Sequence, residues 1–131
     1  MNQQQRNRYL ENSIQTASPA QLLIMLFDGA IRSCKLAIDA IEHRDIPAAN
    51  RELQKAQAII NEFIITMDKN SELSANLIPL YEYMNRRLFE SNTKKNIEPI
   101  HEVLGYLTEL RETWYQASKS IGSSYSGATY G

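Results

Sequence analysis

The sequence predicts an all-α fold, an antiparallel up-down four-helix bundle with a mobile N-terminal segment and a disordered C-terminal tail. Apolar residues recur at alternating spacings of three and four in four stretches, and no stretch alternates like a β-strand. Capping residues and polar turns separate these stretches. Four helices of about 20 to 25 residues joined by short loops favour up-down-up-down packing.

The first predicted helix covers residues 19–42. Ser18 is its N-cap, Pro19 stands at the first helical position, and Gln21 completes a capping box. The polar turn "HRD" follows the helix. The spacing predicts these core-facing residues: Leu23, Phe27, Ala30, Cys34, Ala37 and Ile41.

The turn "DKNSE" separates the second and third predicted helices. The second runs over residues 46–68 with Pro47 in its first turn, and the third over 73–91. The third is expected to be bent or to begin late, because Pro79 removes one hydrogen bond of the helical ladder. The second core stripe is Ala49, Leu53, Ala56, Ile60, Phe63 and Met67. The third is Leu73, Leu77, Leu80, Met84 and Leu88.

The fourth predicted helix covers residues 97–121, with Pro99 in its first turn and Gly122 as its stop. Its stripe is Ile100, Val103, Leu107, Leu110, Trp114 and Ala117, in which Trp114 is expected to be structural. The Gly/Ser-rich end and the Gln/Asn-rich start are expected to be disordered. The predicted organisation is a leader (1–17), a bundle (18–121) and a tail (122–131).

Charge and composition exclude several classes of partner. The chain has 131 residues, with 14 basic and 15 acidic ones and a net charge of −1, which gives no electrostatic case for nucleic acid or anionic lipid. The apolar run 22–27 is shorter than the about 20 residues of a membrane span, so no stable membrane insertion is expected. A single cysteine and no evident signal peptide indicate the cytoplasm.

No residue pattern supports an enzyme, a metal or a cofactor. Glu98 and His101 have the Glu-x-x-His spacing of di-iron bundles, but a second copy is missing because Ala40 stands three residues before His43. Cys34 lies on the core stripe and is expected to be a small buried residue. The alternative function is a signalling or phosphorelay module that uses an exposed His101.

Surplus apolar surface is the feature that points to function. The first helix has an apolar or small-residue arc of about 240°, more than a bundle helix needs, and Gly29, Ser33 and Ala40 leave room for another chain. The predicted partner-binding residues are Leu22, Met25, Leu26, Gly29, Leu36, Ile65, Ile78 and Phe89. The alternative is that Met25 and Leu36 pack on a neighbouring helix and that the others are ordinary surface apolar residues.

The leader carries few large apolar residues, namely Tyr9, Leu10 and Ile14. Exposing several apolar side chains costs roughly 1.5 to 3 kcal/mol each, so docking of the leader on an apolar groove would be favoured. The leader is therefore predicted to act as a removable lid.

Several spaced motifs, taken together, resemble one family, the flagellin-specific export chaperone FliS. They are Tyr9, "TASPAQLLIMLFDGAI" (16–31), "KAQAII" (55–60), "NLIPLYEYMNRRL" (76–88) and Trp114. The chain departs from the family at Phe27, where a tyrosine is usual. The likeness gives no guidance for residues 122–131.

The resemblance implies a cytosolic helical-bundle chaperone without enzymatic activity. Such a chaperone binds the C-terminal segment of flagellin, prevents its premature polymerisation and delivers it to the flagellar type III export gate. The leader would occupy part of the client surface until flagellin binds. Whether the free chain is a monomer or a homodimer is left open.

Overall fold

The structure, a computed structural model, describes residues 5, 8 and 17–130, and of residues 120–130 it describes the backbone only. The helices are α2 (Pro19–Glu42), α3 (Ile46–Thr66), α4 (Glu72–Lys94) and α5 (Glu98–Tyr130). The part of the chain described contains no strand. The predicted all-α four-helix bundle is confirmed.

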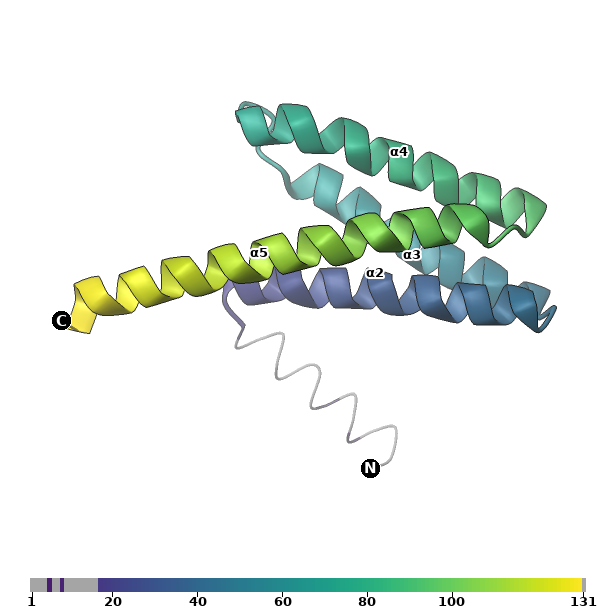
Figure 1. The fold of residues 1–131 in the computed structure, drawn as a ribbon, viewed down its shortest axis with the longest axis horizontal. Coiled ribbons are helices and arrows are strands. Elements are labelled where there is room, and N and C mark those ends of the chain that lie inside the picture. The colour runs from purple at the N-terminus through teal and green to yellow at the C-terminus, as the bar shows by residue number, and fades with distance from the viewer. Residues whose placement is uncertain (1–4, 6–7, 9–16, 131) are drawn as a thin grey trace.

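The four helices form a closed ring. Each packs against the next along the chain, and α5 returns to pack against α2. Successive helices run in opposite directions (Figure 1). One end of the bundle therefore carries the α2–α3 and α4–α5 turns, and the other carries the start of α2, the α3–α4 turn and the later part of α5.

Side-chain caps explain where the helices begin. The Ser18 hydroxyl accepts a hydrogen bond from the Gln21 amide at 3.2 Å, and the Gln21 side chain accepts one from the Ser18 amide at 2.8 Å. This confirms the predicted capping box. Asp45 caps α3 through the Ala48 amide in the same way, and Ser71 caps α4.

Five predicted helix limits differ from the structure. α4 ends at Lys94 rather than at residue 91, and α5 starts at Glu98 rather than at residue 97. α3 ends at Thr66 rather than at residue 68, because Met67 has an extended backbone. α4 starts at Glu72 and carries Pro79 inside, so the expectation of a late start is wrong. α5 does not stop at residue 121 but continues to Tyr130, since no glycine in the described part of the chain takes the positive φ that ends a helix.

The extension of α5 projects beyond the start of α2 (Figure 1). Helical stability in proteins comes mainly from packing of an apolar face, and short unpacked helices are marginal in water. Disorder of residues 122–131 in solution therefore stays a prediction.

The core consists largely of the predicted stripes. All of the second stripe is buried except Met67, and Ile100, Val103 and Leu107 are buried on α5. Three aromatic rings of the core pack in tilted pairs, with 4.5 Å between the centroids of Phe27 and Phe63 and 5.3 Å between those of Phe63 and Tyr81. Tyr81 is a core residue that the stripe analysis missed.

Two further core assignments concern single residues. Cys34 is fully buried as predicted, and burial raises the pKa of its thiol to about 12, so the thiol is unreactive near neutral pH. Leu73, predicted to face the core, is 48% exposed, so that prediction is wrong. Leu73 lies in the first turn of α4, where α4 stands away from α5 (Figure 1).

Candidate functional site

The wide apolar arc of α2 is explained largely by its two neighbours, α3 and α5. Ser33 and Ala40 are buried inside the bundle, so the room expected for another chain beside them is already filled. A methyl group on Gly29 would lie 3.4 Å from Ile59 Cδ1 of α3, so the close approach that Gly29 permits is to α3. Leu26 is partly buried and packs against the core.

An apolar groove remains on the outside of α2 and α5, which we call the α2–α5 groove. Its volume is about 550 Å³, and it is lined by Ala17, Gln21, Ile24, Met25, Tyr115, Ser118 and Lys119. The Tyr115 ring has the Arg111 guanidinium 5.5 Å and the Lys119 ammonium 5.4 Å from its centroid. Arg111 also pairs with Asp28 of α2 at 2.5 Å. The groove thus has an apolar floor and a polar rim.

The outer face of α3 and α4 carries isolated apolar side chains. Ile65 is 70% exposed and Phe89 is 66% exposed, whereas Ile78 is half-buried. Asn85 donates a hydrogen bond to Asn61 across the two helices at 2.9 Å. The predicted exposure of Ile65 and Phe89 is confirmed, and their partner-binding role stays a prediction.

The remaining predicted partner-binding residues lie on α2. Leu36 is 40% exposed, and Leu22 is partly buried. The predicted lid residues Tyr9, Leu10 and Ile14 lie outside the described residues. The eight predicted residues therefore do not form one patch: some lie at the bundle core, Met25 lines the α2–α5 groove, Leu22 and Leu36 lie elsewhere on α2, and the others lie on α3 and α4.

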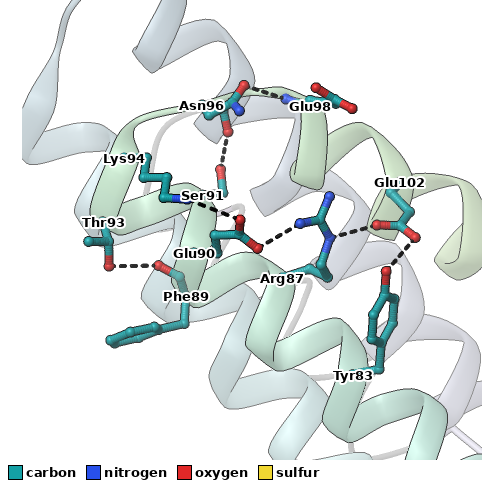
Figure 2. A network of polar contacts seen from close by, with 10 residues as sticks. All are labelled: Tyr83, Arg87, Phe89, Glu90, Ser91, Thr93, Lys94, Asn96, Glu98 and Glu102. Atoms are coloured by element: carbon teal, nitrogen blue, oxygen red, sulfur yellow. Dashed lines mark hydrogen bonds and ion pairs between the residues drawn. The ribbon is translucent and has the colours of Figure 1, made fainter.

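A polar network, which we call the seam network, ties the middle and end of α4 to α5 (Figure 2). Glu102 of α5 accepts hydrogen bonds from Arg87 Nε at 2.7 Å and from the Tyr83 hydroxyl at 2.8 Å. Arg87 also donates to Glu90 at 2.6 Å. The hydrogen bond from Arg87, followed by that from Tyr83, lowers the pKa of Glu102. The Phe89 side chain points away from this seam network (Figure 2).

The start of α4 faces α5 across an apolar space, which we call the α4–α5 hollow. Its volume is about 290 Å³, and it is lined by Leu73, Leu77, Leu110, Thr113, Trp114 and Ala117. A second space of about 230 Å³, the inner hollow, reaches Phe63 and shares Leu73 and Trp114 with the first.

Trp114 is partly buried between the two hollows and packs against the core, in keeping with the structural role expected of it. Burial raises the pKa of Tyr81 to about 12, although the interaction of its side chain with Trp114 opposes the rise. The three-four spacing of the sequence places Trp114 on the core-facing side of α5. It carries no signal for the two hollows beside Trp114.

The chemistry of the histidines gives no catalytic arrangement. His101 is exposed on α5, and His43 hydrogen-bonds through Nδ1 to the Asp39 carbonyl at 2.8 Å. Among the described residues, no three His, Cys, Asp or Glu side chains gather into a group that could hold a metal ion. Nor does any described helix combine the length and apolar character needed to cross a membrane.

Comparison with known proteins gives a consistent result. The model of the family described as "Flagellar protein FliS" matches residues 1–121. The flagellar secretion chaperone FliS of Bacillus subtilis is 43% identical over 112 residues, which cover 86% of this chain and 84% of the relative. Those of Salmonella typhimurium and Escherichia coli are 38% and 32% identical, and each match covers at least 82% of both chains.

Proposed function

This chain belongs to the FliS family of flagellar secretion chaperones, and from that membership we propose that its client is the C-terminal segment of flagellin. The protein is an export chaperone of flagellum biogenesis and not an enzyme, so the phosphorelay alternative through His101 has no support. The chaperone covers the flagellin segment in the cytoplasm, prevents premature polymerisation and delivers it to the flagellar type III export gate.

The observation that best supports client binding is the α2–α5 groove. An amphipathic helix or an extended segment can bury apolar side chains against Ile24 and Met25 while its polar side faces the rim at Lys119. Ile65 and Phe89 add apolar contact points on other faces, and their separation favours a client that wraps around the bundle.

Two single charge substitutions test the surface. Ile65→Glu places a carboxylate on a side chain that is 70% exposed, and Met25→Glu places one in the groove. Both variants should fold, because substitutions at exposed sites usually change stability by less than about 0.5 kcal/mol and Met25 is only partly covered. In the complex the added charge would lose water without gaining a partner, which costs several kcal/mol. Titration calorimetry with a flagellin C-terminal fragment should therefore show a large loss of affinity.

Ile46→Glu is the matched control. Ile46 is 44% exposed at the start of α3 and lies outside the proposed surface. This variant should bind the fragment like the parent protein. Normal binding by Met25→Glu and Ile65→Glu would contradict the assigned surface, and no binding by the parent protein would contradict the client.

The leader is proposed to compete with the client for this surface. Deletion of residues 1–15 should leave a folded bundle that binds the fragment at least as tightly, because removing a competitor raises the binding-competent fraction. Calorimetry and a thermal melt of the same sample provide the check. A folded truncated protein with most of its affinity lost would instead make the leader part of the client site.

A further inference from the structure

The two halves of α4 are attached to α5 in different ways. Tyr83 and Arg87 of α4 donate hydrogen bonds to Glu102 of α5. Within residues 72–119, which the structure describes in full, each hydrogen bond and ion pair between α4 and α5 involves Tyr81 or a later residue of α4. The first two turns of α4 make no such polar bond to α5, and Leu73 and Leu77 line the hollow between the two helices.

Those apolar side chains do not close the space between the helices. The α4–α5 hollow of about 290 Å³ separates Leu73 and Leu77 from Leu110 and Trp114, and Leu73 is 48% exposed. An ordered water needs two to four polar partners, and Thr113 is the only polar residue in the lining. The hollow is open to solvent, its lining offers water few hydrogen bonds, and the chain does not fill it.

Pro79 lies between the two halves. It has no N–H to donate to the Ala75 carbonyl four residues earlier, and prolines inside helices are sites of bending. At the other end of this segment, Ser71 and Ser74 both donate hydrogen bonds to the Asp68 carbonyl in the α3–α4 turn. The segment before Pro79 is therefore held at its start and weakened at its end.

We infer that residues 72–78 form a flap that pivots at Pro79 between the open position of the structure and a closed position. In the closed position Leu73 and Leu77 pack against Leu110 and Trp114, and the hollow is lost. Burial of apolar surface favours closing, and the hydrogen bonds at Asp68 limit it. The inference concerns the free protein and does not depend on the identity of the client.

Distance measurements between spin labels on two exposed positions test the flap. Ala75→Cys on α4 and Gln116→Cys on α5 report on the hollow, whereas Thr93→Cys and His101→Cys report on the half of α4 tied to α5 by the seam network. Cys34 can stay, because its buried thiol does not react. Labelling of the unsubstituted protein verifies this.

If the flap exists, the distribution of distances between the labels should have two peaks for the Ala75/Gln116 pair and one narrow peak for the Thr93/His101 pair. Pro79→Ala restores the missing donor and should leave a single distance at the hollow. Pro47→Ala is the matched control, because Pro47 stands in the first turn of α3 where no donor is needed. It should leave both distances of the Ala75/Gln116 pair in place.

Amide hydrogen exchange of the unlabelled protein gives a second readout. Residues 72–78 should exchange roughly tenfold faster in the parent protein than in Pro79→Ala, with no change in residues 84–94. A single narrow distance distribution for each of the two label pairs in the parent protein would overturn the inference, whatever the proline variants show. So would equal exchange in the parent and Pro79→Ala proteins.

Discussion

The seam between α4 and α5 has two unlike halves. Near the α4–α5 turn, Glu102 collects hydrogen bonds from Tyr83 and Arg87, and the helices lie close together (Figures 1 and 2). Near the start of α4, Leu73 and Trp114 line a hollow instead. Directional polar contacts fix the register of two helices, whereas apolar contacts permit several arrangements. One pair of helices thus combines a fixed half with an adaptable half.

Within the adaptable half, the largest expected effect comes from Trp114→Ala. Truncating a large aromatic side chain to alanine in a protein core lowers the free energy of unfolding by about 3 to 5 kcal/mol. We expect a loss of about 3 kcal/mol, at the lower end, because Trp114 is only partly buried and already borders two hollows. Urea unfolding measures it. A loss below about 1 kcal/mol would show that Trp114 is not a structural residue.

Replacing each of two alanines by leucine compares the packing of the bundle core with that of the α4–α5 hollow. Ala56 is fully buried in the core, so Ala56→Leu should cost about 1 to 3 kcal/mol through overpacking. Ala117→Leu adds its methylenes to the α4–α5 hollow and should be neutral or stabilising by up to about 1 kcal/mol. The free energies of unfolding of the two variants check this. Equal losses would mean that the hollow is not available space.

The stability that the fixed half contributes should depend on pH. The pKa of Glu102 is lowered from its ordinary 4.5 in the folded protein, mainly by Arg87. The stability that this carboxylate contributes is therefore fully present above its unfolded pKa and is lost as the pH falls through the lower folded pKa. The effect should be modest, because the network is partly exposed.

Glu102→Gln isolates this contribution. The variant should be slightly less stable than the parent protein at neutral pH, and the difference should shrink in acid. Urea midpoints at neutral and acidic pH measure the trend. A difference that grows in acid would contradict the assignment of the lowered pKa.

The smallest expected effect is that of Phe89→Ala. Phe89 lies beside the network in Figure 2, but its side chain is 66% exposed, so the change should stay within about 0.5 kcal/mol. The adjacent Leu88 is fully buried, and Leu88→Ala should cost about 2 to 5 kcal/mol. Thermal melts of the two neighbours check the contrast. A comparable loss in both would place Phe89 in the core.

Much of the fold could be predicted because local patterns determine it. The capping box at Ser18 sets the start of α2, and the three-four spacing identifies the buried stripes. The errors have physical causes. Periodicity gives the direction of a side chain but not the distance to the next helix, so the exposure of Leu73 was missed. Gly122 weakens a helix by only about 1 kcal/mol and does not end α5.

The candidate site could be predicted less well. Ile65 and Phe89 stand opposite the core stripes, so their exposure follows from the sequence. Ser33 and Ala40 were expected to leave room for another chain but are buried, because helical spacing gives the direction of a side chain and not how closely the neighbouring helices approach it. The α2–α5 groove joins Met25 to Tyr115, and such a contact between the first and last helices depends on ring closure.

Ring closure also decides how the chain could be rearranged. Ala17, before α2, and Lys119, far along α5, line the same groove, although about a hundred positions separate them. A short peptide linker after Lys119 could therefore lead back to Ala17 without crossing a helix. New termini could then be opened in the α2–α3 turn at Arg44, at the opposite end of the bundle. In such a circular permutant each helix would keep its neighbours. The groove and both hollows would then lie at the end of the bundle that carries no chain terminus.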